Sequence, residues 1–324
     1  MRLRRLRTLP VSAIGLGCMG LSEYHPGRDA KLSAPALHRA LDLGITLFDT
    51  ADSYGDRVNE HLVGKALAGR RDQVVVATKF GVERSPYGTG TRVNGRPGYV
   101  RAACDASLRR LGIDVIDLYY QHHVDPDVPL EETWGAMAEL VAVGKVRHLG
   151  IVDARPEMIR RADAVHPVTA VQTEYSVGTR TPEVNGVLDT CRELGIGLVA
   201  RSPLGRGLLA GRSRDLPGLA ARDSRRADPR FAAGNLDTHR ALAERLASIA
   251  DVRGCTVAQL AIAWLLHQGF DIVPIPGTGL LHHLYDNAEA TTVFLDTIDL
   301  GTIDHAAPAT PAGRHPDAVA AASR

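Results

Sequence analysis

Residues 73–79 read QVVVATK, the clearest strand in the sequence. The run is apolar at consecutive positions rather than at alternate ones, which is typical of a strand buried on both faces. Strands of this kind occur in parallel sheets whose two faces are covered by helices. The sequence on either side should therefore alternate between short strands and amphipathic helices.

Seven further segments have the length and composition of strands. They are IGLG at 14–17, ITLFDT at 45–50, VIDLYYQH at 115–122, VRHLGIV at 146–152, AVQTEY at 170–175, GIGLVAR at 195–201 and DIVPIPG at 271–277. Apolar residues at helical spacing lie between them, and Thr256 with Gln259 forms a capping box before one such stripe. Eight strand–helix units without a linker predict a single (β/α)8 TIM barrel domain over residues 1–324.

Three segments lie outside this alternation. The N-terminal MRLRRLRTLP predicts a short strand pair that caps the barrel and has solvated arginines. Residues 211–237, with six arginines between 212 and 230, predict a long loop, and 305–324 a C-terminal tail. The alternative fold is a doubly wound sheet, since Gly15, Gly17 and Gly20 have GxGxxG spacing, although Leu21 onward does not resemble the start of a helix.

Composition excludes several classes of protein. The chain of 324 residues is 44% hydrophobic and 23% charged, which is near average for a globular protein. Its 38 Lys and Arg against 37 Asp and Glu give a net charge of +1, so nothing indicates nucleic acid or a membrane as partner. The four cysteines lie far apart and predict reduced thiols in a cytoplasmic protein.

Polar residues at the C-terminal strand ends are the candidates for catalysis, because active sites of barrels of this kind lie there. Asp49, Lys79 and His122 end three different strands, and Tyr54 follows the second strand by five residues. Taken singly, an Asp there is usually a cap and a Lys is usually solvated. His122 with His123 could alternatively bind a metal ion, but no HxH occurs and no metal site is expected.

Seven longer motifs add to these residues. They are LFDTADSYGDRVNEHLVGKAL, VVVATKFG, LRRLGIDVIDLYYQHHVDP, GKVRHLGIVD, AVQTEYS, SPLGRGLLAG and VPIPGT. In this order they closely resemble the aldo-keto reductases over nearly the whole chain. The resemblance implies a (β/α)8 barrel that reduces aldehydes or ketones with NADP(H). The family's catalytic tetrad corresponds to Asp49, Tyr54, Lys79 and His122.

The chemistry of these four residues agrees with that assignment. Hydride transfer to a carbonyl carbon leaves negative charge on the oxygen, which then needs a proton donor. A free tyrosine is too weak an acid at neutral pH, and a nearby ammonium lowers its pKa. We expect Asp49 to keep Lys79 charged, Lys79 to acidify Tyr54, and His122 to orient or polarise the carbonyl oxygen.

By the same resemblance, NADPH is expected across the barrel mouth, with NADH as the alternative, and the 211–237 loop lies on the cofactor side. The family's cofactor-binding positions correspond to Val152, Asp153, Gln172, Arg201, Ser202, Leu204, Gly205, Gly277, Thr278, His283, Asp286 and Asn287. Met19, Tyr24, Phe80 and His123 are expected to line the pocket for a small-molecule carbonyl substrate.

Three positions depart from the family pattern. Val152 replaces a usual Ser near the carboxamide, and Arg201 replaces an aromatic residue that stacks on nicotinamide. Gly279, Leu280 and Leu281 replace the basic residues that hold the 2′-phosphate, so NADP is not clearly favoured over NAD. Arginines of the 211–237 loop either close over the cofactor in compensation or are solvated.

Two other functions compete with carbonyl reduction. The same barrel serves in relatives as a nicotinamide-binding regulatory or sensor subunit, and retention of all four tetrad residues favours the enzyme. A metal-dependent hydrolase using His122 and His123 is the third candidate.

Overall fold

Eight parallel strands form one sheet in the computed structural model, which describes residues 1–22, 33–84, 91–210 and 224–307. In sheet order they are β12 (Ile272–Pro274), β11 (Gly197–Arg201), β10 (Val168–Glu174), β9 (Val146–Val152), β8 (Ile116–Gln121), β5 (Val75–Phe80), β4 (Leu47–Asp49) and β3 (Leu16–Gly17). Each overlaps one of the eight segments expected from the sequence.

Backbone hydrogen bonds join the first and last strands of this sheet. Gly15 N donates to Pro274 O at 2.9 Å, and Gly17 N donates to Pro276 O at 3.3 Å. The sheet therefore curls round on itself, and the predicted (β/α)8 barrel is confirmed. The doubly wound alternative is wrong, because an open sheet has no such contact between its edge strands.

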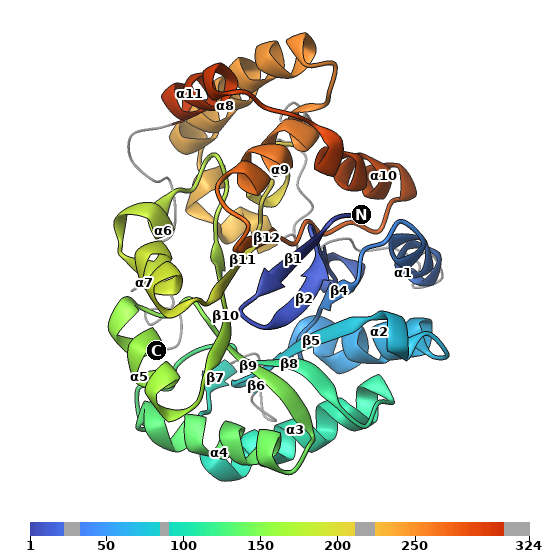
Figure 1. The fold of residues 1–324 in the computed structure, drawn as a ribbon, viewed down its shortest axis with the longest axis vertical. Helices are drawn as coiled ribbons and strands as arrows, with labels where there is room; N and C mark the ends of the chain where they lie inside the picture. Colours follow the sequence, from blue (N-terminus) through green and yellow to red (C-terminus); the bar gives the residue numbers. More distant parts are fainter. Residues whose placement is uncertain (23–32, 85–90, 211–223, 308–324) are drawn as a thin grey trace.

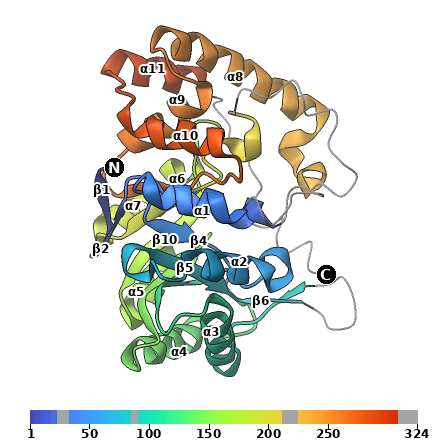
Figure 2. The same ribbon diagram turned by 90° about the vertical axis from the view of Figure 1, so that its right-hand side faces the viewer.

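Helices surround the strands, as Figure 1 shows. They are α1 (Ser33–Asp42), α2 (Val58–Leu67), α3 (Pro97–Leu111), α4 (Leu130–Ala142), α5 (Pro156–Val165), α6 (Thr181–Val184), α7 (Val187–Leu194), α8 (Ala233–Val252), α9 (Val257–His267), α10 (Leu281–Glu289) and α11 (Thr297–Ala306). The capping box of Thr256 and Gln259 is present at the start of α9. Helices α8 and α11 pack together outside the ring, at the end away from α3 and α4 (Figure 2).

The two extra helices correct the boundaries expected for the irregular segments. Helix α8 begins at Ala233, so the last five residues of the predicted 211–237 loop are helical, and α11 continues to Ala306, beyond the start of the predicted tail. No single helix among the described residues is long and apolar enough to span a membrane. One pair, Gly234–Val252 with Val257–His267, would pass by length and composition but bends by 87°.

An antiparallel hairpin closes the N-terminal end of the barrel. Strands β1 (Leu3–Leu6) and β2 (Leu9–Ser12) pair over the centre of the ring in Figure 1. Leu6 lies so close to Gly197 of β11 that a Cβ added there would be 2.6 Å from the Cα of Leu6. The predicted capping strand pair is confirmed.

Arg4 corrects the expectation that the hairpin arginines are solvated. Its side chain is buried and donates hydrogen bonds to the carbonyl oxygens of Leu266, Gly269 and Ile272, at the end of α9 and the start of β12. Burial lowers the pKa of Arg4 to about 10, and Asp271 opposes this effect. These three hydrogen bonds to backbone carbonyl oxygens offset the cost of burying the guanidinium.

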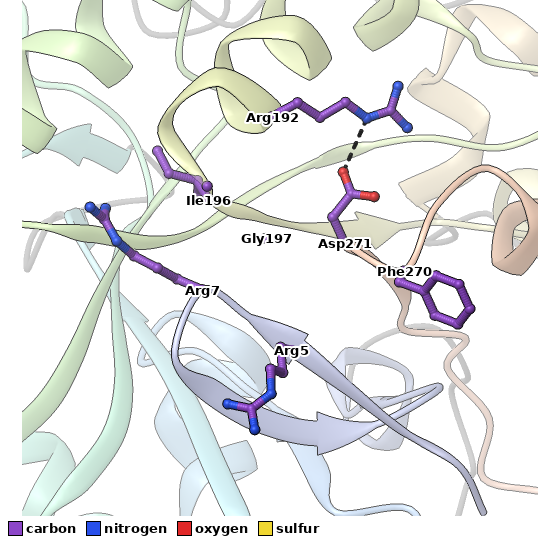
Figure 3. A pocket seen from close by; sticks show the side chains of 8 residues that line it. Arg5, Arg7, Arg192, Ile196, Gly197, Phe270 and Asp271 are labelled. Carbon is purple, nitrogen blue, oxygen red and sulfur yellow. Dashed lines mark hydrogen bonds and ion pairs between the residues drawn. The ribbon is translucent and has the colours of Figure 1, made fainter.

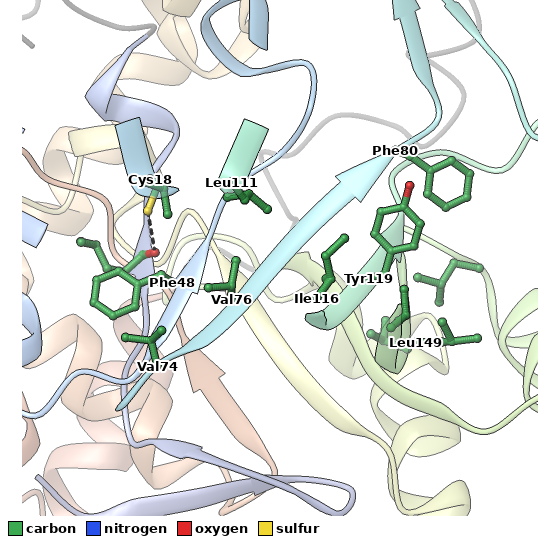
Figure 4. Packing of buried hydrophobic residues seen from close by; sticks show 14 of the residues in the cluster. Cys18, Phe48, Val74, Val76, Phe80, Leu111, Ile116, Tyr119 and Leu149 are labelled. Atoms are coloured by element: carbon green, nitrogen blue, oxygen red, sulfur yellow. Dashed lines mark hydrogen bonds between the residues drawn. The ribbon is translucent and has the colours of Figure 1, made fainter. Parts of the chain in front are cut away.

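Side chains of the barrel strands alternate between two apolar layers. Val76 and Phe80 of β5 point outward and pack with Phe48 and Tyr119 beneath the helices (Figure 4). Ala77 points inward with Leu47, Leu118 and Tyr120. Since successive side chains of a strand point to opposite faces, Lys79 shares the inner face with Ala77. Because side chains alternate along the strand, Lys79 points into the barrel and its apolar neighbour Phe80 points outward.

Candidate active site

A buried ion pair between Asp49 and Lys79 forms the centre of the site. Asp49 ends β4 and Lys79 lies on the adjacent strand β5, and both side chains are at most 3% exposed. Lys79 Nζ donates to Asp49 Oδ1 and, at 2.9 Å, to the carbonyl oxygen of Thr50. Gln172 Nε2 donates to the other carboxylate oxygen at 2.8 Å. Burial acts to lower the pKa of Lys79, but Asp49 and Tyr54 raise it overall, so the amine stays charged.

Tyr54 lies beside this pair, in the turn that follows β4. Lys79 Nζ is 5.1 Å from the centroid of the Tyr54 ring. Burial raises the pKa of Tyr54, and this outweighs Lys79, which acts to lower it. The expected direction of the lysine effect is therefore right, but the net shift is upward. Tyr54 holds its proton at neutral pH.

His122 completes the group of four at the end of β8. Its backbone N donates to Phe80 O at 2.8 Å, and its ring stands edge-on to Tyr54 with the centroids 6.1 Å apart. Burial lowers the pKa of His122 well below its ordinary value, and nearby charges act in the same direction. The imidazole is therefore neutral. Its buried Nδ1 has no hydrogen-bond partner in the described part of the chain.

Arg201, at the end of β11, joins the ends of three strands. Its Nη2 donates to Asp153 Oδ2 of the segment after β9 at 2.7 Å, and its Nη1 donates to Glu174 Oε2 of β10 at 3.5 Å. Its positive charge acts to lower the pKa values of both Tyr54 and His122. The two carboxylates offset much of this charge.

The backbone is strained at two residues next to Arg201, its ion-pair partner Asp153 and its chain neighbour Ser202. Asp153 and Ser202 have φ values of 49° and 50°, in the left-handed region that residues other than glycine rarely adopt. Such conformations persist only where the surroundings fix them, and they are common at functional sites. The strain thus coincides with two of the predicted cofactor-binding residues.

A further ion network joins Arg206, Asp228 and Arg230 to the end of β10, and the sequence analysis did not identify it. Arg230 donates both Nη groups to Glu174, at 2.6 and 2.9 Å, and its Nε to Asp228 at 3.0 Å. Arg206 donates to the same Asp228 at 2.9 Å. Arg230 is 3% exposed, so it is neither a solvated loop residue nor an unpaired cation. Glu174 is visible as a strand-end residue, but its partner 56 residues later is not.

The other predicted cofactor residues near nicotinamide lie at the same strand ends. Val152 is buried in the inner apolar layer, and Gln172 is engaged by Asp49 through its amide nitrogen. Ser202 is half-buried, and Leu204 and Gly205 lead into the 3-10 turn η5 (Gly205–Gly207).

The predicted adenine-end residues lie between β12 and α10. Gly277 is exposed, and Thr278 Oγ1 accepts a hydrogen bond from Leu280 N at 3.0 Å, just before α10. On the helix, Asn287 is buried, Asp286 is half-buried, and the ring of His283 lies 4.2 Å from that of His282.

Helix α1 supplies a basic residue next to α10 that the sequence analysis missed. Arg39 Nε donates to the Tyr285 hydroxyl at 2.6 Å, and the guanidinium lies 4.9 Å from the centroid of that ring. The two residues are 246 positions apart and meet only because the barrel closes.

The predicted substrate residues have different outcomes. His123 stacks on His122, with centroids 4.9 Å apart and planes within 4°. Met19 is half-buried in η1 (Met19–Leu21), directly after β3, and Tyr24 lies outside the described residues. The prediction for Phe80 is wrong. Its side chain is fully buried against Tyr119 in the outer layer, because it alternates with the inward-facing Lys79.

No group of three or more His, Cys, Asp or Glu side chains suited to a metal ion occurs in residues 1–22, 33–84, 91–210 and 224–307. A cavity of about 300 Å³ lies at the opposite end of the barrel, lined by Arg5, Arg7, Arg192 and Phe270 among others (Figure 3). None of the predicted site residues lines it.

Known proteins share both the sequence pattern and the barrel. The sequence profile of the Aldo/keto reductase family matches residues 13–308. A glycerol dehydrogenase from Gluconobacter oxydans is 28% identical with a TM-score of 0.86, and the match covers 94% of each chain. An aldo-keto reductase from Bacillus halodurans is 30% identical with a TM-score of 0.80, covering 96% of this chain and 97% of that one.

A third structure contains the cofactor. It is an aldo/keto reductase from Klebsiella pneumoniae in complex with NADP and acetate, 28% identical with a TM-score of 0.74, and the match covers 94% of this chain and 95% of that one. The family profile covers far more than half of the sequence. The chain therefore belongs to the aldo/keto reductase family of NAD(P)H-dependent oxidoreductases.

Proposed function

We propose that this protein reduces an aldehyde or ketone to an alcohol, with NADPH as hydride donor and Tyr54 as proton donor. The observation that carries the proposal is the buried contact of Lys79 with both Asp49 and Tyr54, beside a neutral His122. This arrangement matches the chemistry of carbonyl reduction, in which oxygen gains negative charge and then a proton. A cytoplasmic enzyme is expected, since the four cysteines form no disulfides.

The residues present fit a nicotinamide cofactor. Backbone at the C-terminal strand ends is available to bind it. Asp153, Ser202 and Gly205 have positive φ values there, and Gly277, after β12, is exposed. Amides at the start of α10 can bind phosphate, because the first N–H groups of a helix have no partner within it. When bound, the cofactor supplies the hydride for the carbonyl carbon.

Each tetrad residue then has a separate role. Tyr54, protonated at neutral pH, donates its proton to the developing alkoxide. Lys79 stabilises the tyrosinate that remains, and Asp49 with Gln172 holds the ammonium in place. The neutral His122 orients the carbonyl oxygen by donating a hydrogen bond from Nε2, with Nδ1 as the unprotonated nitrogen. Met19 and His123 would line the substrate pocket.

Turnover of a panel of carbonyl compounds with NADPH and NADH in parallel tests the proposal. Tyr54→Phe should lower kcat by about 10² or more and leave the Kd of NADPH unchanged, since only the proton donor is removed. EDTA should have no effect on either protein. A Tyr54→Phe variant that reduces aldehydes as fast as the parent would show that another group is the acid. A parent that binds NADPH tightly but reduces none of the panel would favour a sensor subunit.

A further inference from the structure

The turn that carries Tyr54 is strained and depends on its surroundings. Gly55, Asp56 and Arg57 follow Tyr54 with φ values of 54°, 53° and 72°, three consecutive left-handed residues of which two are not glycine. Helix α2 begins directly afterwards, at Val58. A backbone of this kind holds one geometry only where neighbouring groups fix it. Whatever fixes this turn also determines where the Tyr54 hydroxyl lies.

Asn59, the second residue of α2, is the buried group that joins this turn to its neighbours. Its side chain is 0% exposed, and Thr50 Oγ1 donates to its Oδ1 at 2.7 Å. Its Nδ2 donates to Cys18 O at 2.9 Å and to Ser22 Oγ at 2.7 Å. Both amide hydrogens and the carbonyl oxygen are therefore used, on two different segments of the chain.

Both segments lead to a catalytic residue. Thr50 accepts the hydrogen bond of Lys79 through its carbonyl oxygen, so Asn59 is two hydrogen bonds away from the ammonium. Ser22 packs against the turn of Tyr54: a Cβ added to Gly55 would lie 2.5 Å from Ser22 Oγ. Asn59 thus binds both Thr50, which orients Lys79, and Ser22, which supports the turn of Tyr54.

We propose that Asn59 is a positioning residue for proton transfer, which sets the distance between Lys79 and Tyr54 through Thr50 and Ser22. The inference rests on the proposed carbonyl reduction. The hydrogen bonds of Asn59 go to Thr50, Cys18 and Ser22, and it acts through the backbone and hydroxyl groups that it binds. Its loss should move Tyr54 away from Lys79, which weakens the proton donor and raises the pKa of the tyrosine.

The test compares Asn59→Leu and Thr50→Val, singly and together. Each single variant should lower kcat by about 10²-fold, the typical effect of a misplacement of about 1 Å, with the Kd of NADPH unchanged. The alkaline limb of the pH–rate profile, where Tyr54 loses its proton, should move to higher pH. The kcat of the double variant should be no lower than that of Asn59→Leu, because both changes break the same connection from Asn59 through Thr50 to Lys79. Thr133→Val is the matched control, since it also removes a buried hydroxyl hydrogen bond, from Thr133 to Gly95 O at 2.7 Å.

The proposal is overturned if Asn59→Leu keeps the kcat and the alkaline limb of the parent, or if Thr133→Val shifts that limb equally. If Asn59→Leu does not fold, Thr50→Val carries the same expectations and the same contradiction. If the parent reduces no carbonyl, the proposed function fails, and the positioning role of Asn59 is then tested separately by amide hydrogen exchange of residues 50–60. If these amides exchange as slowly in Thr50→Val as in the parent, the positioning role is refuted.

Discussion

At the level of single residues, Lys79 combines full burial with a permanent charge. A buried ammonium is costly unless it is paired, and Asp49 and Tyr54 together keep its pKa above the ordinary value. Lys79→Met should therefore lower kcat and raise the pKa of Tyr54 further. Because the reducing enzyme needs protonated tyrosine, the alkaline limb of its pH–rate profile should move to higher pH. The measurement is kcat/KM from pH 6 to 11.

A second variant separates this effect from simple loss of stability. Lys79→Met leaves the Asp49 carboxylate buried without a cation, which is strongly destabilising. The double variant Asp49→Asn with Lys79→Met removes both charges and should regain much of the stability but none of the activity. If the double variant recovers the kcat of the parent, Lys79 has no part in proton transfer.

Arg201 stands where the family usually has an aromatic residue, and it is paired with Asp153 and Glu174. Oxidised nicotinamide carries a positive charge and the reduced ring carries none. Arg201→Tyr removes a cation and leaves Asp153 without its partner, so it should favour the oxidised form. Unit charges about 4 Å apart interact by about 1 kcal/mol in water, which is about fivefold in affinity. The Kd values of NADP⁺ and NADPH should shift relative to each other by at least that factor.

Arg192 provides the control for charge alone. It pairs with Asp271 at 3.2 Å at the opposite end of the barrel (Figure 3), so Arg192→Gln should leave the ratio of the two Kd values unchanged. An unchanged ratio in Arg201→Tyr would mean that its two carboxylates cancel its charge at the nicotinamide.

The strand-end rule predicts single site residues where the backbone alone positions them. Asp49, Lys79 and His122 follow from strand length and from the direction in which a barrel opens. Phe80 shows the limit, because a shift of one residue along a strand turns a side chain to the other layer. Arg230 and Arg39 could not be predicted, since their partners Glu174 and Tyr285 come from distant segments that only the closed barrel brings near.

At the level of elements, the segment from Asp52 to Glu60 joins strand β4 to helix α2 through buried polar groups. Asp52 is 7% exposed, and its Oδ1 has no hydrogen-bond partner in the described residues. Burial raises the pKa of Asp52 to about 7, and the nearby Glu60 adds to this effect, while Arg110 and Arg57 oppose it. The folded protein therefore holds a proton on Asp52 at a pH where the unfolded chain has lost it.

The sign of the resulting pH dependence follows from proton binding. Between about pH 4 and 7 the folded state binds more protons at Asp52 than the unfolded state, so stability falls as pH rises. The contribution of Asp52 to the free energy of unfolding is complete below the ordinary aspartate pKa and is lost as pH rises through 7. In the parent this lowers the free energy of unfolding by roughly 2–4 kcal/mol over the range, and Asp52→Asn should abolish that decrease. Urea unfolding of both proteins at pH 5 and pH 8 measures it, and equal pH dependence in the two would contradict it.

Elements were predictable where periodicity is strong and local. The eight barrel strands and the capping box of α9 follow from short-range patterns. Helix α8 was not separated from the loop before it, because its first residues, AGNLD at 233–237, include Gly, Asn and Asp, which have low helix propensity. The burial of Arg4 was not predictable either, since its three acceptors lie more than 260 residues away.

At the level of the whole molecule, one narrow contact closes the barrel. Strand β3 has only two residues, and two hydrogen bonds join Gly15 and Gly17 to Pro274 at the end of β12 and to Pro276 just after it. The apolar layers on both sides of the sheet depend on this closure, as does the neighbourhood of α1 and α10. The sequence predicts the number of strands, but how closely the first and last approach each other is a property of the folded ring.

The glycines with GxGxxG spacing allow this closure to be tested. A Cβ on Gly17 would lie 2.9 Å from Ile275 O, a backbone atom that cannot move aside, whereas one on Gly20 would meet nothing within 4 Å. Neither residue has a positive φ, so the two differ in space rather than in backbone conformation. Gly17→Ala should force the first and last strands apart and lower the free energy of unfolding by about 1–3 kcal/mol, as overpacking does. Gly20→Ala should change it by less than about 0.5 kcal/mol. Urea unfolding followed by tryptophan fluorescence measures both, since Trp134 and Trp264 are fully buried on different helices. Equal midpoints for Gly17→Ala and Gly20→Ala would show that the join between β3 and β12 accommodates a methyl group, and that the barrel is less tightly closed than its hydrogen bonds indicate.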